Sequence, residues 1–283
     1  MPIDYDTAKA LSSTDQAFSY SERDTMLYAL GVGMGDDPLD EKELPFVYEN
    51  GLKVVPTQAT VMAWGAGKTA AMGINFMMVV HGEQRLTVHK PLPTDGNILA
   101  DWTVDEIVDK GEGKGALIYN TTVLKDAKSG DTLATLGSTT FARADGGFGG
   151  PSSGGPAIHE RPDRPADRTV SMATKPDQAL IYRLSGDRNP LHSDPNFAKA
   201  AGFPRPILHG LCTYGVCCRA ALKAYADYDP ARIKQFDVRF SAPVFPGETI
   251  DVDFWEDGDT LSFEARVAAR DATVIRNGKC VLG

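Results

Sequence analysis

The 283-residue sequence lacks a long apolar run, an excess of positive charge and a signal-like beginning. No apolar stretch approaches the ~18 residues that a membrane-spanning helix needs, and MPIDYDTAKA has no apolar core of a signal peptide. The formal net charge of −9 disfavours nucleic-acid binders, since these carry a basic face. The chain also lacks a peroxisomal Ser-Lys-Leu ending. We therefore expect a soluble cytoplasmic protein that binds neither membrane nor nucleic acid.

The sequence has few cysteines, and none is spaced for a metal cluster. The four cysteines all lie in the second half, and no CxxC pair occurs. Structural zinc sites need closely spaced Cys or His pairs, so a zinc cluster is not expected. We expect buried, reduced thiols at these positions, which are Cys212, Cys217, Cys218 and Cys280.

One segment is dense in glycine, serine and proline and interrupts the chain near its middle. It reads ADGGFGGPSSGGPAIHERPDRP over residues 144–165. Such a composition does not nucleate a helix or strand and is typical of a linker. We therefore predict a domain over residues 1–143, a linker over 144–168 and a second domain over 169–283.

The two halves repeat one another at a nearly constant offset of about 152 residues. SERDTMLYALGVG from Ser21 matches TKPDQALIYRLSG from Thr174, and both begin with a capping-box pattern. VVPTQATVMAW (54–64) corresponds to PILHGLCTYGV (206–216), and RLTVHKPLPTDGNI (85–98) to DVRFSAPVFPGETI (237–250). Three matches in the same order indicate a duplicated domain.

Each half is predicted to contain short helices, one central helix and then a run of strands. The segment 209–225, HGLCTYGVCCRAALKAY, is apolar or small on nearly every face, which is typical of a helix buried on all sides. Four segments with alternating polarity follow it and predict an antiparallel sheet. An antiparallel sheet curled around one buried helix is the hot-dog arrangement. The duplicated sequence thus predicts an α+β double hot-dog fold, with the two sheets joined side by side.

A turn in the second half, SGDRNPLH (185–192), brings together a carboxylate, a carboxamide and an imidazole. Pro190 forbids a regular helix, so Asp187, Asn189 and His192 can converge. Ordinary turn chemistry would also favour Asp and Asn here. A metal site is a further alternative, with His209 as the third ligand. The first half has no histidine at the corresponding place, so any chemistry is expected on one side only.

Gly210, at the start of the predicted central helix, offers a second element of a site. Helix N-termini present unpaired N–H groups, and a glycine lets a ligand approach them closely. Such a group suits a developing oxyanion, for example the enolate of a thioester. Together with Asp187 and His192, it could add water to an α,β-unsaturated thioester. A simple packing glycine is the alternative.

The long stretch YRLSGDRNPLHSDPNFAKAAGFPRPILHGLCTYG (182–215) resembles the signature of hydratase 2, the (R)-specific 2-enoyl-CoA hydratases of the MaoC-like family. The shorter strings LYALGVG, HGEQ, KPLP, DKGEG, GGFGG and PVFPGET are similar to the hydratase part of the peroxisomal multifunctional enzyme. The resemblance implies reversible hydration of trans-2-enoyl-CoA in fatty acyl-CoA metabolism. It also implies a degenerate N-terminal half that houses the acyl tail and a catalytic C-terminal half.

The resemblance assigns roles to individual residues. It makes Asp187 and His192 the catalytic pair, Asn189 the residue that places the water, and Gly210 the oxyanion-hole donor. One departure is Arg188, where the peroxisomal enzymes often carry Trp; this difference concerns substrate preference and leaves the reaction class unaffected.

The resemblance also implies four contacts with the CoA ester. Lys110 would pair with a CoA phosphate, Phe240 would offer apolar surface, and His81 and Gly82 would complete the contacts. A turn lysine and a core aromatic are the alternatives for Lys110 and Phe240. No metal or redox cofactor is implied, and CoA arrives only as part of the substrate.

Two rival functions stay open from the sequence, an acyl-CoA thioesterase of the same fold and a non-catalytic acyl-CoA-binding protein. The intact Asp187–His192 pair argues against the second. As partners we expect the acyl-CoA substrate, a second copy of the chain in a homodimer, and a separate (R)-3-hydroxyacyl-CoA dehydrogenase.

Overall fold

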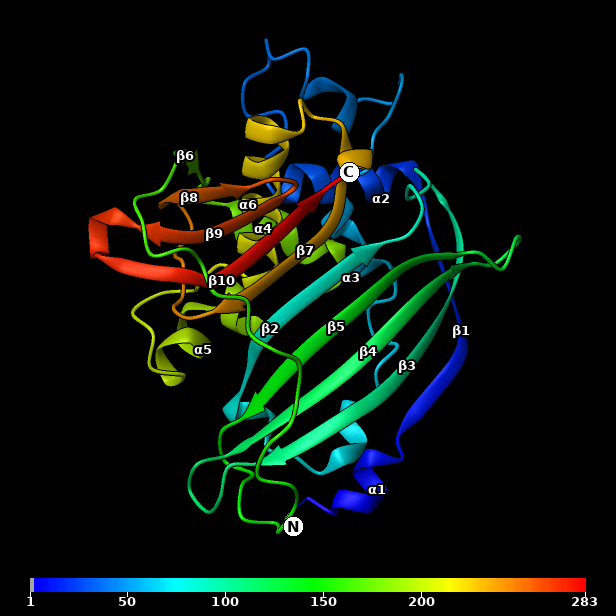
Figure 1. Cartoon of the computed structure of the whole chain (residues 1–283), viewed down its shortest axis with the longest axis vertical. Coiled ribbons are helices and arrows are strands. Elements are labelled where there is room, and N and C mark those ends of the chain that lie inside the picture. Colours follow the sequence, from blue (N-terminus) through cyan, green and yellow to red (C-terminus); the bar gives the residue numbers. More distant parts are fainter. Residues whose placement is uncertain (1–2) are drawn as a thin grey trace.

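A computed structural model describes residues 3–283 and is built on one ten-stranded antiparallel sheet (Figure 1). The strand order is β1-β3-β4-β5-β2-β7-β10-β9-β8-β6. The strands of the first half are β1 (Ser12–Tyr20), β2 (Val79–Val88), β3 (Gly96–Asp109), β4 (Ala116–Asp126) and β5 (Thr132–Ala142). Those of the second half are β6 (Arg168–Ala173), β7 (Ile233–Phe240), β8 (Thr249–Asp257), β9 (Thr260–Val267) and β10 (Ala272–Leu282).

The strand order confirms the duplication, because each half has the same internal sequence of neighbours. The first five strands pair as β1-β3-β4-β5-β2, and the last five repeat this pattern from the opposite edge as β6-β8-β9-β10-β7. The halves join where β2 pairs antiparallel with β7, with Gln84 opposite Val238. The predicted α+β fold with two sheets joined side by side is therefore correct.

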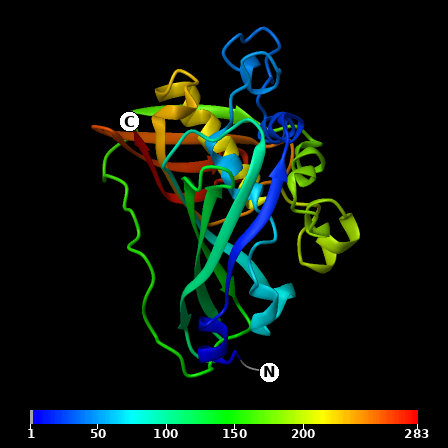
Figure 2. The ribbon, with the colours of Figure 1, turned by 90° about the vertical axis from the view of Figure 1, so that its right-hand side faces the viewer.

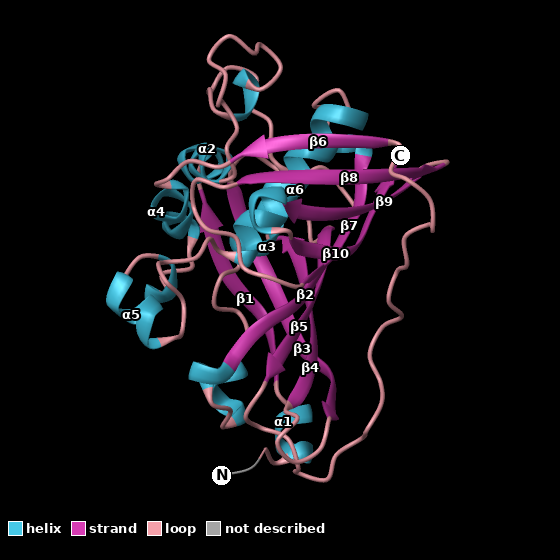
Figure 3. Ribbon diagram, turned by 90° about the vertical axis from the view of Figure 1, so that its left-hand side faces the viewer, coloured by secondary structure: helices cyan, strands magenta, loops and turns pink. Residues whose placement is uncertain are grey.

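The predicted central helix of the second half is α6 (Gly210–Tyr225), and it packs inside the curl of the sheet (Figure 3). Every residue from 211 to 222 is buried, as the apolar composition of the segment requires. Even Arg219 is buried, and its Nε and Nη2 donate to the two carboxylate oxygens of Glu43 at 2.9 and 3.0 Å. This buried pair ties α6 to a loop of the first half.

The predicted central helix of the first half is shorter than expected. A 3₁₀ turn, Pro56–Gln58, is followed by α3 (Ala59–Met62), and together they are much shorter than α6 in the second half. Gly65 then adopts a left-handed conformation, with φ of 95°, in the glycine-rich stretch that follows. The first sheet is thus covered by less helix than the second.

Two further expectations about helices and strands were incomplete. A strand precedes the expected helices of each half: β1 lies between the short helix α1 and α2, and β6 comes before α4. The capping box of α2 (Glu22–Gly31) forms at Ser21 as predicted. Its expected counterpart at Thr174 is wrong, because α4 (Gln178–Tyr182) begins after Asp177. The other helices are α1 (Tyr5–Lys9) and α5 (Pro195–Ala200), the latter capped by Asp194.

The segment between β5 and β6 contains turns and bends and runs along the face of the sheet opposite the helices (Figure 2). It is held there by His159, whose ring lies 2.8 Å from Ser262 Oγ and whose main-chain oxygen accepts from Asn277. All four cysteines are buried and unpaired, as expected. Among residues 3–283, no helix combines the length and the hydropathy needed to cross a membrane.

Candidate active site

The turn over residues 185–192 is shaped by two Asx turns, which direct its side chains. The main-chain N–H of Asn189 donates to Asp187 Oδ1, and that of Leu191 donates to Asn189 Oδ1, both at 3.0 Å. Gly186 precedes them with φ of 137°, and a Cβ here would lie 2.8 Å from Trp64 of the first half. The turn is therefore an ordinary Asx structure that is also pressed against the other half.

His192 is buried at the end of the short 3₁₀ helix Pro190–His192. Its Nδ1 lies 2.9 Å from the main-chain oxygen of Ile207, which can only accept, so Nδ1 carries the proton. Burial lowers the pKa of His192 below its ordinary value, against opposing contributions from the Ile207 oxygen and Asp187. The ring is therefore neutral near pH 7, with Nε2 free to accept a proton.

His209, the N-cap residue of α6, completes the cluster. Its Nε2–H donates to the main-chain oxygen of Asp187 at 3.1 Å, and its ring stacks on that of His192 with centroids 3.8 Å apart. Burial, with a smaller effect of His192, lowers the pKa of His209 to about 3, so this ring is also neutral. The sequence offered His209 only as a metal ligand, and its contact with Asp187 depends on tertiary structure.

One ligating atom each from Asp187, His192 and His209 lies within 4.8 Å of the others, which by distance alone would admit a metal ion. Each histidine donates one ring N–H to a main-chain carbonyl, so each ring has one nitrogen lone pair left. The remaining lone pairs lie in the planes of two stacked rings, which are 28° apart, and so do not converge well on a single point. The arrangement suits acid–base chemistry better than metal binding.

The N-terminus of α6 lies beside this cluster and presents the main chain of Gly210. The first helical hydrogen bond runs from the Thr213 N–H to the His209 oxygen, so the N–H groups of the first turn lack intrahelical acceptors. A Cβ at Gly210 would lie 3.3 Å from the ring of Phe240. Glycine thus keeps a narrow approach to these N–H groups open.

His81 and Phe240 come from the two central strands and meet at the same place. Their ring centroids are 4.9 Å apart, and the His81 Nε2–H donates to the main-chain oxygen of Glu83 at 3.0 Å. Burial lowers the pKa of His81 to about 4, so it is neutral. Gly82 forms a β-bulge in β2, where a Cβ would lie 3.1 Å from the Thr139 oxygen.

A cavity of about 430 Å³ connects this cluster with the first half. His81, Asp187 and Asn189 line it, together with side chains from α3, β2, β4 and β5. Lys110 does not line it. It is exposed in the β3–β4 hairpin, where its N–H donates to the Gly115 oxygen. The structure therefore brings together seven of the eight predicted site residues, which either line this cavity or lie next to residues that line it. Lys110 alone lies apart from them.

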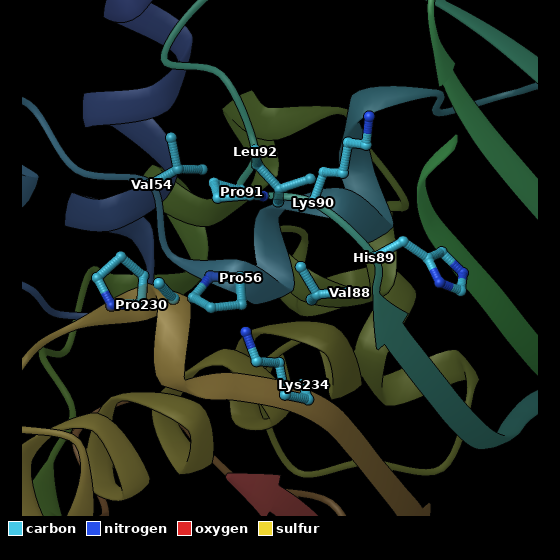
Figure 4. A pocket seen from close by; sticks show the side chains of 10 residues that line it. Val54, Pro56, Val88, His89, Lys90, Pro91, Leu92, Pro230 and Lys234 are labelled. Atoms are coloured by element: carbon cyan, nitrogen blue, oxygen red, sulfur yellow. The ribbon is translucent and has the colours of Figure 1, made fainter. Parts of the chain in front are cut away.

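The first half has a smaller hollow of about 90 Å³ at the equivalent position (Figure 4). At the repeat offset of 152 residues, its Val88 and Lys234 correspond to Phe240 and Gly82. Its lining residues, all in the described part of the chain, include no carboxylate. The duplicated fold thus has two related places, and the Asp–His pair occupies only one.

Comparisons with known proteins agree with this fold. Residues 18–144 match the model of the MFE-2 hydratase 2 N-terminal domain, and residues 156–277 match that of the MaoC like domain. The MaoC-like dehydratase from Phytophthora capsici superposes with a TM-score of 0.88 at 33% identity, over 99% of this chain and 98% of the other. The peroxisomal multifunctional enzyme type 2 from Drosophila melanogaster gives 0.82 at 36% identity, over 96% of this chain and 48% of that one.

Curated relatives extend the likeness over nearly the whole sequence. Enoyl-CoA hydratase ChsH3 of Mycobacterium tuberculosis is 40% identical over 98% of both chains. Enoyl-CoA hydratase 2 of Arabidopsis thaliana, a peroxisomal protein, is 38% identical over 91% of this chain and 89% of the relative. The ten-stranded sheet with a one-sided polar cluster defines a double hot-dog protein of the MaoC-like class. Within that class, the chain belongs to the hydratase 2 family.

Proposed function

We propose that this protein is a lyase that reversibly hydrates trans-2-enoyl-CoA to (R)-3-hydroxyacyl-CoA. The observation that carries the proposal is the juxtaposition of the Asp187 carboxylate, the free Nε2 of His192 and the N-terminus of α6 at one end of a cavity. Membership of the hydratase 2 family supports it, as do relatives named enoyl-CoA hydratase.

In this mechanism Asp187 and His192 hold one water molecule between them. Both groups are acceptors, so the water donates its two hydrogens to them and directs a lone pair at the β-carbon. As the C–O bond forms, one of the pair takes a proton from the water. That proton then passes to the α-carbon, so the enzyme regains its starting state. Because one site delivers both the hydroxyl and the proton, they add to the same face. Asn189 helps to place the water.

The negative charge that develops on the thioester oxygen is stabilised at the N-terminus of α6. The N–H of Gly210 would donate to this oxygen, and the helix dipole favours the charge. Phe240 and His81 lie beside Gly210 and confine the thioester group. A neutral His81 adds no competing positive charge near the enolate.

The acyl chain would occupy the 430 Å³ cavity, whose volume lies within the usual range for ligand pockets, about 300–1,000 Å³. The short helix α3 leaves this space above the first sheet. Trp64 and Phe76 line the cavity and are 42% and 54% exposed, so they mark its open side. Lys110 would bind a CoA phosphate outside the cavity.

We propose no metal or redox cofactor for this reaction, since each step uses side chains of the cluster and the α6 N-terminus. Some relatives combine activities in one chain. One is the peroxisomal hydratase-dehydrogenase-epimerase of Neurospora crassa, of which this chain matches 28%. We propose that a separate (R)-3-hydroxyacyl-CoA dehydrogenase acts beside this protein in the cytoplasm, and that the protein works as a homodimer.

A hydration assay over a series of trans-2-enoyl-CoA chain lengths, with chiral analysis of the product, tests the proposal. Loss of the enoyl absorbance with (R)-3-hydroxyacyl-CoA as product is the expected result. Release of free CoA, detected with a thiol reagent, would instead identify a thioesterase. Binding without turnover would identify an acyl-CoA-binding protein.

A further inference from the structure

A row of polar side chains crosses the floor of the acyl cavity. Gln84 of β2 stands opposite Ser138 of β5, and Ser138 stands opposite Asn120 of β4. All three line the cavity, and so do Thr122 and Thr140 in the adjacent rows. A cavity for a plain hydrocarbon chain would be expected to present apolar side chains here, because buried polar groups are costly when unpaired.

The orientation of the Asn120 amide is fixed by its neighbours. Trp102 Nε1, which can only donate, lies 3.2 Å from Asn120 Oδ1, and the Ser138 hydroxyl donates to the same oxygen at 2.9 Å. The Nδ2 group therefore points away from both partners and has no acceptor within residues 3–283. Asn120 is only 6% exposed and lies at the cavity wall, so its two N–H donors face the cavity.

The Gln84 amide is fixed in the opposite sense. Its Nε2 donates to the main-chain oxygens of Arg85 and Gly137 at 3.0 and 3.2 Å, and these oxygens can only accept. Its Oε1 has no donor in the described part of the chain, although Gln84 is only 4% exposed. The floor thus offers a free acceptor at Gln84 and a free donor at Asn120, two strands apart.

We propose that the cavity selects enoyl-CoA substrates whose acyl chain carries an oxygen substituent, foremost a hydroxyl, where the chain crosses the row Gln84–Ser138–Asn120. This inference rests on the proposed hydratase function and specifies its substrate class. A hydroxyl can donate to Gln84 Oε1 or accept from Asn120 Nδ2, whereas a methylene chain would leave both groups unpaired. His81 beside the reacting end and Gln84 are three residues apart on β2, about 10 Å, so the oxygen lies some way along the chain.

The test is a comparison of kcat/KM for trans-2-dodecenoyl-CoA and a series of derivatives with one hydroxyl moved along the distal half of the chain. We expect at least one position to exceed the parent by about tenfold, which corresponds to one satisfied buried group. Gln84→Met and Asn120→Leu each remove one of the two groups, and the variant that removes the group paired with the preferred hydroxyl should abolish that advantage. Thr121→Val, which changes the neighbouring residue on the outer face of β4, should retain it.

The outcomes separate this inference from the function on which it rests. If wild-type protein hydrates crotonyl-CoA but no hydroxylated derivative exceeds its parent, the substrate class is wrong and the hydratase function stands. An advantage that survives both Gln84→Met and Asn120→Leu also overturns the inference. Should Asn120→Leu fail to fold because Trp102 loses its acceptor, Asn120→Asp keeps that acceptor and removes the donors. Failure to hydrate crotonyl-CoA overturns the function itself.

Discussion

The imidazole rings of His192 and His209 stack on one another, with their centroids 3.8 Å apart. His209 also donates to the main-chain oxygen of Asp187. One side chain at the start of α6 therefore orients both members of the proposed catalytic pair, although it precedes the helix by a single residue and is remote from the turn in sequence. We assign His209 a positioning role, since it holds Asp187 and His192 and its one N–H is engaged with the main-chain oxygen of Asp187.

Substitution of His209 tests this positioning role with two complementary variants. His209→Phe keeps a stacking ring and loses the hydrogen bond, whereas His209→Gln can keep the hydrogen bond and loses the ring. We expect each to lower kcat about tenfold, the equivalent of one interaction of about 1.4 kcal/mol, with a smaller change in KM. Steady-state kinetics with crotonyl-CoA measure this, and unchanged kcat in both variants would contradict it.

The buried state of His209 predicts a pH dependence of stability. Its pKa falls from about 6.5 when unfolded to about 3 when folded, so the unfolded chain binds more protons between these values. The contribution of the neutral, buried His209 to the free energy of unfolding is complete above pH 6.5 and is lost as the pH falls below that value. Between pH 6.5 and 5 this one group should cost about 2 kcal/mol of unfolding free energy. Urea unfolding measures it, and the slope should be shallower in His209→Phe; an equal slope in both proteins would show that His209 is not responsible.

Gly210→Ala should slow the reaction without destabilising the protein. The added methyl group would lie against the Phe240 ring and narrow the approach to the first N–H groups of α6. We expect kcat to fall by about 10²-fold, as when an oxyanion donor is lost, while Tm stays within a few degrees. The double variant Gly210→Ala/Phe240→Leu relieves the ring contact alone. Full recovery of kcat in this double variant would mean that the methyl group acts only through the Phe240 ring. The α6 N-terminus would then not be the oxyanion donor.

The Glu43–Arg219 pair predicts a large effect on stability and none on the chemistry. Both side chains are at least nine-tenths buried, and Tyr228 also donates to Glu43. Arg219→Met leaves a buried carboxylate without its cation and should cost about 3–5 kcal/mol of unfolding free energy. Glu43→Gln/Arg219→Met removes both charges and should cost clearly less. Urea unfolding of the wild-type protein and the two variants measures these losses of unfolding free energy. An equal loss in both variants would contradict the ion-pair account.

The sequence predicted the duplicated fold well because its signals are local and repeated. The alternating polarity of 233–282 gives β7 to β10, and the apolar segment 209–225 gives α6 almost to the residue. The short first helix was not predicted, since VVPTQATVMAW matches its counterpart in pattern and the early end depends on the glycines after Met62. Strands β1 and β6 were missed because they are edge strands, whose sequences are more polar.

At the site, proximity in sequence decided what could be foreseen. Asp187, Asn189 and His192 lie in one turn, so their convergence follows from Pro190 and the Asx turns. The contact between His209 and Asp187, and the polar row from Gln84 to Asn120, arise only when distant segments pack together. A polar residue at an inward-facing strand position, such as Asn120 two residues after the buried Ile118, was the available signal for that row.

The most direct test of the account is the hydration of crotonyl-CoA by wild-type protein and by Asp187→Asn and His192→Gln, followed through the enoyl absorbance. Each substitution removes one of the two acceptors for the water, so we predict that kcat falls by about 10²–10⁴-fold in each while the folded state persists. The combined variant should be little slower than either single one, because the two groups act on one water. Hydration at the wild-type rate in either single variant would contradict the account.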